Sequence, residues 1–484
     1  MPSKATLACR RRARHRGASR SARLAFGCGS PCMAVLFSPW SQRMRHALIV
    51  PDATRSHILV IASSRGLSLP SVRVRREHPG AIDAVLAAVR RRYGLRASVL
   101  RPVARPRDPA TGAFNVALEL ERFDESPMRG RGARWIPIAE VAHRSPLYRT
   151  DDREAWARWR RRARARPEWA RPGWRDRALR WAARRIGVPL TAVEQSRAWE
   201  SSCVYCLRTN RGAFYLKAVA ARCDWEPSLT RWLARQFPRL IAPVVAVGGG
   251  GRWLLSRAAP GSILADSGRL PEWERAAFEY GRMQRALVGR TAALLRLGCT
   301  RRGPRWALRE MPALFRDRRA LAAGGRERLS AREIARLRAL APLLRARGRA
   351  LAACAVPLSL DHSDFWAGNM IASRRGPVYL DWEDAAVSHP FWSVFMLPWS
   401  HGFHDRWGAR GAAARRVKEA YLVGWSGREG TARYRAAFDL AQSLAPLHYA
   451  ATWARDTIPY LETSLETATL LPFFLRRLLE TAPR

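Results

Sequence analysis

The sequence predicts a mixed α+β protein in which a small α/β domain precedes a β-rich unit and a longer helical unit. Three observations indicate this order. Residues 45–145 alternate short β-type runs with one amphipathic helix, residues 188–260 hold several β-type runs, and residues 261–484 repeat apolar side chains at helical spacing. Runs rich in β-branched and apolar residues favour strands, whereas helical spacing favours helices with one buried face. A chain of 484 residues can hold two or three domains that each bury a core.

The chain is strongly basic. It has 86 lysine and arginine residues against 39 acidic residues, a formal charge of +47, and its only lysines are Lys4, Lys217 and Lys418. Such a charge suits a surface that binds nucleic acid or another polyanion. An almost exclusive use of arginine, with abundant Ala, Gly and Pro, is also what a GC-rich coding sequence produces wherever a surface cation is tolerated. The composition leaves both interpretations open.

Cysteine content and hydropathy indicate the compartment. The eight cysteines form no disulfide framework for a chain of this length. Cys203 and Cys206 form a lone C-x-x-C in a strand-like run, which favours a buried strand pair over a zinc or redox site, and Cys28 with Cys32 is a still weaker metal signal. No run reaches the roughly 18 apolar residues that spanning a membrane requires. We expect a cytoplasmic protein with no membrane partner.

Residues 1–44 are rich in Arg, Ser and Ala, and no acidic residue occurs before Asp52. This composition is typical of a basic disordered tail, or of spurious translation upstream of a true start at Met33 or Met44. It also resembles the composition of an organellar transit peptide.

Residues 45–145 predict a compact α/β domain. His57–Ser63 and 114–120 are expected to be strands because of their β-branched and apolar content. Pro79–Leu95 is expected to be an amphipathic helix, with Gly94 in the C-cap position. A further strand-like segment, Trp135–Ile138, follows.

This order of a strand, a helix that ends in Gly94-Leu95, and further strands resembles a Nudix-type domain. In that family the helix carries an Arg-Glu pair and a Glu-Glu pair that bind magnesium. Alignment on Gly94-Leu95 places Ala87 and Ala88 at the first pair, and Arg91 and Arg92 at the second. Cations cannot ligate magnesium. The resemblance therefore implies a degenerate Nudix-like fold without pyrophosphohydrolase chemistry; a plain α/β accessory domain is the alternative.

Residues 146–187 are an Arg- and Trp-rich linker that becomes a helix. Basic patches with interleaved aromatic residues can bind single-stranded nucleic acid by stacking. The plainer account is a helix that packs its tryptophans against the next domain. The tryptophans concerned are Trp156, Trp159, Trp169, Trp174 and Trp181.

Residues 188–260 begin with a predicted β-hairpin. Cys203–Thr209 and Ala213–Ala218 are strand-like, and Asn210-Arg211-Gly212 forms the turn between them. The second strand presents Lys217. In a chain that otherwise uses arginine, a lysine between apolar residues indicates that the broader guanidinium would not serve there.

Lys217 lies where kinase folds place the lysine that grips the nucleotide phosphates, and a helix glutamate usually holds that lysine. Glu226, which opens the next helix, is the expected partner. A first-turn glutamate also suits the helix dipole, so this assignment has a purely structural alternative. Gly248–Gly251 lacks the spacing of a phosphate-binding loop and is expected to be a hairpin turn.

The strongest chemical signal spans Asp361–Asn369 and Leu380–Asp384. It places Asn369 five positions after Asp364, and Asp381 twelve positions after Asn369. Phosphoryl transfer from a nucleotide needs one carboxylate to orient the acceptor hydroxyl, and an amide with a second carboxylate to hold magnesium. Apolar residues on both sides predict two short strands that support the polar loop.

With these elements in order, residues 190–400 resemble the superfamily of aminoglycoside phosphotransferases and choline kinases. The resemblance implies a bilobal protein-kinase-like fold, with a small β-rich N-lobe over residues 188–260 and a helical C-lobe over residues 261–484. It also implies ATP and Mg²⁺ as cofactors. The hinge between the lobes, where the adenine should dock, would be Ser256–Gly261.

The same resemblance implies a role for each matching residue. Asp364 would be the catalytic base or the carboxylate that orients the hydroxyl, and His362 would brace its loop. Lys217, held by Glu226, would bind the nucleotide phosphates. The loop Trp199–Ser202, with Ser201 and Ser202, would cover them. Asn369 and Asp381 would ligate magnesium, assisted by Glu383.

The chain departs from the family pattern at two places. His389–Trp392 looks like the family's following segment, but many members then carry an acidic residue where this chain has Ser393-Val394. The anchoring of the catalytic loop is therefore in doubt. Ser363 stands where glycine is common.

These observations predict an ATP-dependent kinase that phosphorylates a hydroxyl of a small molecule. The acceptor pocket would come from the helices of residues 271–350 and 406–484, which are rich in arginine and poor in clustered acids. A neutral or anionic metabolite fits better than a cationic antibiotic. The alternative is a catalytically inactive kinase-like protein that binds nucleic acid or another polyanion.

Overall fold

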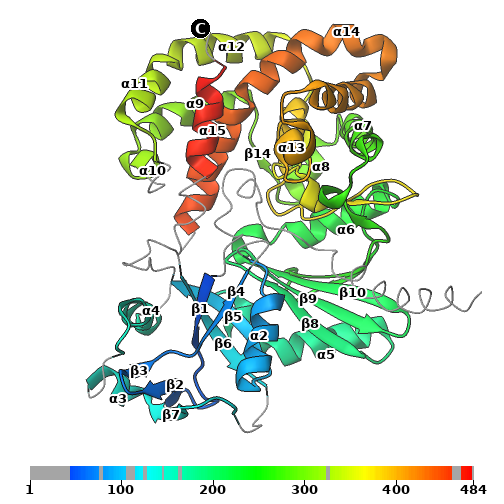
Figure 1. The fold of residues 1–484 in the computed structure, drawn as a ribbon. Helices are drawn as coiled ribbons and strands as arrows, with labels where there is room; N and C mark the ends of the chain where they lie inside the picture. Colours follow the sequence, from blue (N-terminus) through cyan, green and yellow to red (C-terminus); the bar gives the residue numbers. More distant parts are fainter. Residues whose placement is uncertain are drawn as a thin grey trace, which may run out of the picture.

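The computed structural model describes residues 44–75, 80–104, 115–123, 128–143, 147–161, 166–322, 328–460 and 470–481. Figure 1 shows β-rich layers in one half of the molecule and helices in the other, with α6 (Glu226–Gln236) at their junction. Of the tail expected over residues 1–44, only Met44 falls in the described part, so Cys28, Cys32 and Met33 lie outside it.

The N-terminal unit contains two sheets. The larger has the strand order β4-β1-β6-β5, in which β1 runs parallel to β6 and the other neighbours are antiparallel. The smaller is antiparallel, with the order β3-β2-β7. The elements are β1 (Met44–Ile49), β2 (His57–Ser63), β3 (Gly66–Ser68), β4 (Ser71–Val74), α2 (Asp83–Tyr93), β5 (Ala97–Ala104), β6 (Val116–Arg122), β7 (Ala133–Pro137) and α3 (Ile138–His143).

The elements expected in this unit are present. β2 has the expected bounds, and β6 lies two residues later than the expected strand, whose first residue, Phe114, is outside the described part. β7 begins two residues earlier and ends one residue earlier than expected. The helix is α2, shorter than expected; Pro79, its expected first residue, lies outside the described part. Gly94 ends it in the left-handed conformation, with φ of 71°, which glycine adopts without steric cost.

The Arg- and Trp-rich segment folds into α4 (Thr150–Arg160), a short 3-10 helix at Glu168–Ala170, and α5 (Trp174–Ile186). Its tryptophans pack inward. Trp156 and Trp159 stack on each other in the core of the N-terminal unit, and Trp169 and Trp174 are buried against the sheet that follows. Buried indole rings cannot stack on nucleic-acid bases. The structure therefore favours the packing account for this segment.

The sheet that follows is five-stranded and antiparallel, with the order β11-β12-β10-β9-β8. The hairpin expected around Asn210-Arg211-Gly212 is β9–β10, and Gly248–Gly251 is the hairpin turn between β11 and β12, with Gly249 and Gly250 left-handed. The strands are β8 (Ala192–Ala198), β9 (Ser202–Thr209), β10 (Gly212–Val219), β11 (Val244–Gly248) and β12 (Trp253–Arg257).

Cys203 and Cys206 are both buried in β9. Because they are three residues apart on a strand, their side chains lie on opposite faces of the sheet. Cys203 belongs to the core under α5, and Cys206 to the core that faces the hinge. They are free thiols in separate cores, as expected for a buried strand pair.

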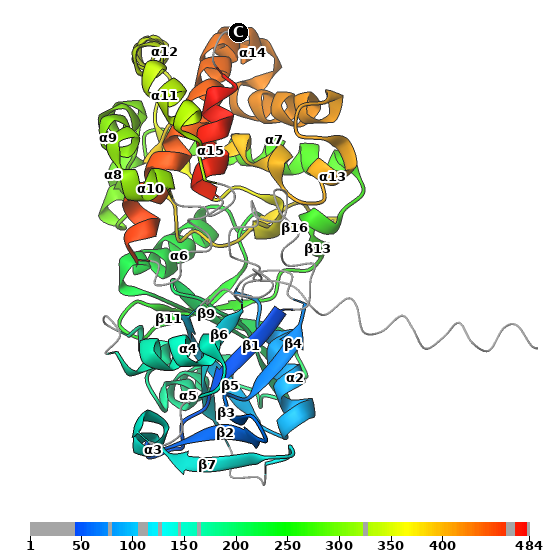
Figure 2. The same ribbon diagram turned by 60° about the vertical axis from the view of Figure 1, so that its left-hand side comes forward.

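The remaining chain is mainly helical, and Figure 2 shows its helices gathered on one side of the five-stranded sheet. Two small three-stranded sheets, β13-β16-β17 and β14-β18-β15, also belong to this part of the chain. No helix within the described ranges combines the length and apolar composition needed to cross a membrane.

The helices of this half are α7 (Leu270–Ala286), α8 (Thr291–Arg296), α9 (Pro304–Arg316), α10 (Arg318–Ala322), α11 (Ala331–Ala339), α12 (Ala341–Ala353), α13 (His404–Trp407), α14 (Ala412–Thr452) and α15 (Leu470–Leu479). α14 is kinked at Gly427, whose backbone is non-helical. The short strands are β13 (Ser262–Ile263), β14 (Thr300–Arg301), β15 (Ser359–Asp361), β16 (Met370–Ala372), β17 (Val378–Tyr379) and β18 (Ala386–Ser388).

Candidate active site

A buried charge cluster forms where β10, α6 and the segment after β17 meet. The Nζ atom of Lys217 lies 2.7 Å from Glu226 Oε2, 2.5 Å from Asp381 Oδ1 and 3.2 Å from Glu383 Oε2. Burial by itself would lower the pKa of Lys217, but the charges of Glu226 and Glu383 raise it above the ordinary value. Lys217 is therefore a fixed cation, and the glutamate expected to hold it does so.

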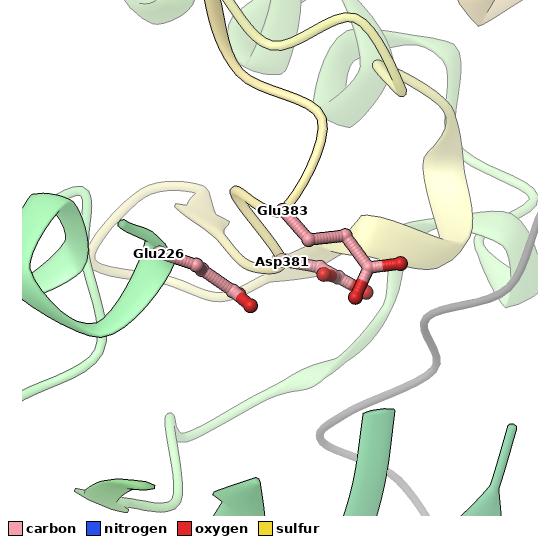
Figure 3. A group of neighbouring side chains, drawn as sticks. All are labelled: Glu226, Asp381 and Glu383. Carbon is pink, nitrogen blue, oxygen red and sulfur yellow. The ribbon is translucent and has the colours of Figure 1, made fainter. Parts of the chain in front are cut away.

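Three carboxylates converge in this cluster from two elements. Figure 3 shows Glu226 reaching in from α6, and Asp381 and Glu383 from the loop after β17. One oxygen of each lies within 4.8 Å of the others. Burial together with the charges of Glu383 and Asp384 raises the pKa of Asp381 well above its usual range. Burial alone would also raise the pKa of Glu383, but Lys217, Arg197 and Arg222 outweigh it and lower the pKa to about 2.

The carboxylates of this cluster, together with the side chain of Asn369, offer the ligands of a magnesium ion. Carboxylate and amide oxygens are the ligands that Mg²⁺ prefers. Asn369 is fully buried, and its Oδ1 atom has no hydrogen-bond partner. Leaving a buried acceptor unpaired costs roughly 1–3 kcal/mol, a cost that a bound cation would remove. Magnesium would also offset the excess negative charge that the pKa of Asp381 reports.

Asp364 and Asn369 form one hydrogen-bonded unit within the loop after β15. Asn369 Nδ2 donates to Asp364 Oδ2 at 2.8 Å and to the Asp364 backbone carbonyl at 3.0 Å. The loop also contains a residue in the left-handed region, Ser363, with φ of 59°. Glycine adopts this conformation without steric cost, whereas a residue with a side chain does not. Ser363 is held in it by donating to Asp361, from Oγ at 3.0 Å and from its backbone N–H at 3.2 Å.

The environment of Asp364 raises its pKa. Burial is the largest cause, followed by the charge of Asp384, and the hydrogen bond from Asn369 only partly opposes them, so the pKa rises to about 7. A carboxyl group with this pKa can accept a proton near neutral pH, which is what general-base catalysis requires.

His362 lies beneath this loop and links it to the carboxylate segment. Its ring Nε2–H donates to the carbonyl of Leu380 at 2.9 Å, and its backbone N–H donates to Tyr280 Oη at 2.9 Å. Burial lowers the pKa of His362 to about 4. The neutral, fully buried ring therefore links this loop to the backbone of Leu380. Leu380 immediately precedes Asp381, whose φ of 65° is also left-handed.

The anchoring that Ser393 puts in doubt is supplied by a different acid. Ser393 Oγ donates to Asp361 Oδ1, and His448 Nε2 on α14 lies 3.2 Å from Asp361 Oδ2. All three side chains are fully buried. Burial would raise the pKa of Asp361, but the hydrogen bond from His448 helps to lower it. In this chain the loop anchor is therefore an acid placed before His362, which sequence reasoning missed.

The loop expected to cover the phosphates lies against the cluster. Ser201 Oγ donates to Glu383 Oε1 at 2.9 Å, and Trp199 N–H donates to the Ser202 carbonyl at 2.8 Å to close the turn. Ser202 Oγ is buried and has no hydrogen-bond partner. The expected hinge, Ser256–Gly261, runs from the end of β12 to β13. A small cavity beside it is lined by residues that include Ser256, Leu254 and Asp381.

One further charged residue of the site escaped the sequence analysis. Arg197 on β8 is 2% exposed, and its Nη1 atom lies 3.9 Å from Asp381 Oδ2. It is one of the many arginines of this chain, so composition gives no signal for it. A weak signal is its place in a strand directly before the loop Trp199–Ser202.

Several solved structures of phosphotransferases and kinases are similar to this chain. A phosphotransferase solved as a ternary complex with streptomycin and ATP shares 14% identity, with 60% of this chain and 97% of that chain covered and a TM-score of 0.38. A macrolide 2'-phosphotransferase of Brachybacterium faecium shares 20% identity, with 61% and 97% covered and a TM-score of 0.40. A choline kinase of Streptococcus pneumoniae shares 11% identity, with 63% and 99% covered and a TM-score of 0.42.

No curated protein matches the chain. Residues 196–437, half of the sequence, match the family described as "Phosphotransferase enzyme family". The chain therefore belongs to this phosphotransferase family.

Proposed function

We propose that the protein transfers the γ-phosphate of ATP to a hydroxyl group of a small molecule, with Mg²⁺ as cofactor. The observation that carries the proposal is the buried centre in which Lys217 and three carboxylates adjoin the hydrogen-bonded pair of Asp364 and Asn369. Phosphoryl transfer depends on positioning and on electrostatic stabilisation of the phosphoryl group, and this centre offers the charges for both.

In this proposal Asp364 orients the acceptor hydroxyl and accepts its proton. Asn369 occupies Oδ2 of Asp364, which leaves Oδ1 for the hydroxyl. Lys217, fixed by Glu226, binds the nucleotide phosphates. Asn369 and Asp381 hold magnesium, assisted by Glu383. When bound, magnesium supplies charge that stabilises the phosphate oxygens.

Nucleotide binding requires a change in the pairing seen here. Lys217 is bonded to Asp381 and Glu383, and Ser201 is bonded to Glu383. With the nucleotide bound, Lys217 would contact its phosphates, and Asp381 and Glu383 would be released from Lys217 to hold magnesium. The loop Trp199–Ser202 would then cover the phosphates with Ser201 and Ser202, and the adenine would dock at Ser256–Gly261.

The acceptor is proposed to be neutral or anionic. The helices expected to form the acceptor pocket, over residues 271–350 and 406–484, are rich in arginine and poor in clustered acids. Their net positive charge disfavours a cationic acceptor.

The N-terminal unit is proposed to be a Nudix-like domain without hydrolase chemistry, with domain limits near residues 145, 187 and 260. Support comes from the position of α2, which packs its buried face against the larger sheet with Val85 and Val89. Arg91 and Arg92, at the positions of the metal-binding pair, are exposed. Within the described residues, the acidic groups that could hold a metal gather only at the kinase-like centre.

Thermal melting and phosphate transfer test the function. Mg-ATP should raise the melting temperature of the wild-type protein, because a ligand that binds only the folded state stabilises it. The variant Asp364→Ala should retain this shift but lose transfer by roughly a hundredfold or more, the usual contribution of a general base. Transfer should be measured over amino alcohols, sugars, nucleosides and aminoglycosides.

The matched control is Asp224→Ala, which removes an exposed aspartate from the same part of the chain and should leave both readouts unchanged. Absence of any Mg-ATP shift in the wild-type protein would contradict nucleotide binding. Equal transfer rates for Asp364→Ala and the wild-type protein would contradict the role of Asp364.

A further inference from the structure

Arg197 shares a row with the nucleotide-binding lysine. It pairs with Val204 in the β8–β9 ladder, and Val204 pairs with Lys217 in the β9–β10 ladder. Residues that are directly opposite in an antiparallel sheet present their side chains on the same face. Arg197 and Lys217 therefore reach the carboxylates from one face of the sheet, and each contacts Asp381.

A β-bulge gives Arg197 this direction. The register passes from Gln195 opposite Tyr205 to Arg197 opposite Val204, so Ser196 is an extra residue on β8. Residues two apart on a regular strand share a face, but the bulge places Gln195 and Arg197 on opposite faces. Gln195 turns towards the N-terminal unit, and Arg197 turns towards the charge cluster.

The N-terminal unit holds the bulge in place. The carbonyl of Ser196 accepts from Ile82 N–H at 3.4 Å, and Ala198 N–H donates to the carbonyl of Gly80 at 3.2 Å. These contacts come from the segment that leads into α2, and they cover the outer edge of β8, which is the edge strand of its sheet. A bulge leaves backbone groups outside the ladder, and here another domain pairs them.

Gln195 completes the contact on the other face. Its Oε1 accepts from Val99 N–H at 2.8 Å, and its Nε2 donates to the Val99 carbonyl at 2.8 Å. Val99 lies on β5, the edge strand of the N-terminal sheet. The side chain of Gln195, the residue before the bulge, thus joins β8 to β5, two edge strands from different units.

We propose that Arg197 is a second phosphate-binding cation of the nucleotide site, and that the N-terminal unit positions it through the bulge of β8. This inference rests on the proposed function. A planar guanidinium matches phosphate oxygens with two donors at once, whereas Lys217 acts as a point charge. A triphosphate adds several negative charges to a site that already holds buried carboxylates, so a second cation on the same face favours its binding.

Steady-state kinetics of Arg197 variants test the first half of the proposal. Arg197→Gln should raise KM for ATP by about tenfold to a hundredfold, the usual loss for a charge-assisted hydrogen bond, with a smaller effect on kcat. Arg197→Lys keeps the charge and should recover part of the affinity; it also carries the test if Arg197→Gln fails to fold. The matched control Arg211→Gln, at an exposed turn of the same sheet, should leave KM unchanged.

The variant Gln195→Leu tests the role of the N-terminal unit. It preserves side-chain size but removes both hydrogen bonds to Val99, so KM for ATP should rise several-fold. In the Arg197→Gln background the same change should add little, because both act through one group.

Each half of the proposal has its own contrary result. A wild-type KM for Arg197→Gln, in a protein that binds Mg-ATP and turns over, would overturn the phosphate-binding role while the proposed function stands. Multiplicative effects of Gln195→Leu and Arg197→Gln would overturn the positioning by the N-terminal unit. A wild-type protein that shows no shift with Mg-ATP would instead overturn the proposed function, and the inference with it.

Discussion

Two residues of the candidate site have left-handed backbones, one in the loop after β15 and one in the segment after β17. Ser363 and Asp381 have φ of 59° and 65°, a conformation that costs a residue with a side chain roughly 1 kcal/mol or more. Each is held by its surroundings: Ser363 by two hydrogen bonds to Asp361, and Asp381 by its ion pair with Lys217. The strain therefore lies next to Asp364, which is proposed to orient the hydroxyl, and at Asp381, which is proposed to hold the metal, as is common at functional sites.

His389 should make stability depend on pH. Its Nδ1 accepts from Phe391 N–H at 3.3 Å, so the ring must be neutral, and burial lowers its pKa from 6.5 to about 3. Below pH 6.5 the unfolded chain binds a proton that the folded chain does not, so stability falls as pH falls towards 3. We expect the stability advantage of the wild-type protein over His389→Asn to shrink by about 2 kcal/mol between neutral pH and pH 5.

Denaturant unfolding of both proteins at each pH measures this difference. His389→Asn keeps a hydrogen-bond acceptor but does not titrate, so the contributions of the other acidic and basic groups cancel in the comparison. A difference that stays constant over this range would show that His389 can be protonated in the folded protein.

At the scale of elements, the catalytic loop is coupled to η7 (Pro390–Phe395) and α14 through one buried acid. Ser393 donates a hydrogen bond to Asp361, and His448 lies 3.2 Å from the same carboxylate. Tyr280 of α7 accepts a hydrogen bond from the backbone N–H of the next residue, His362. Introducing an acid at this position, Ser393→Asp, would place two carboxylates together in the interior. We expect this single change to destabilise the protein by about 3 kcal/mol or more.

Adding Asp361→Ser to Ser393→Asp should recover part of that loss, because the pair again holds one carboxylate and one hydroxyl. The free energy of unfolding of the two single variants and the double variant measures the coupling. Additive effects would mean that Asp361 and Ser393 do not act as one anchor.

The parts of the site that the sequence predicts are those whose residues are close along the chain. Asp364 and Asn369 belong to one loop, and Lys217 lies in a hairpin with a clear strand pattern, so residue type and spacing suffice. Arg197 and His448 can be assigned to the site only from their contacts with Asp381 and Asp361, which are distant in the sequence. A bulge and a buried histidine leave no periodic signal, and among the many arginines of this chain nothing in the sequence distinguishes Arg197.

At the scale of the whole molecule, the N-terminal unit and the five-stranded sheet share one apolar core. Leu100 of β5 and Trp174 of α5 belong to the same cluster as Tyr205 and Leu216 of the sheet. Trp174 and Trp181 pack edge-on against Trp253, with ring centroids 5.7 Å and 5.5 Å away. One face of the sheet is therefore buried under α5, with Trp169 and Leu100 completing the cover.

A chain that begins at residue 188 should consequently aggregate. Without α5, the apolar face around Tyr205 and Leu216 becomes exposed, and such a surface drives association. A chain that begins at residue 167 retains α5 and should stay monomeric, but it should bind Mg-ATP more weakly than the full protein because nothing holds the bulge at Ser196. Light scattering and melting curves compare the two chains. Equal melting temperatures and a monomeric state for both would mean that α5 does not complete the core of the sheet.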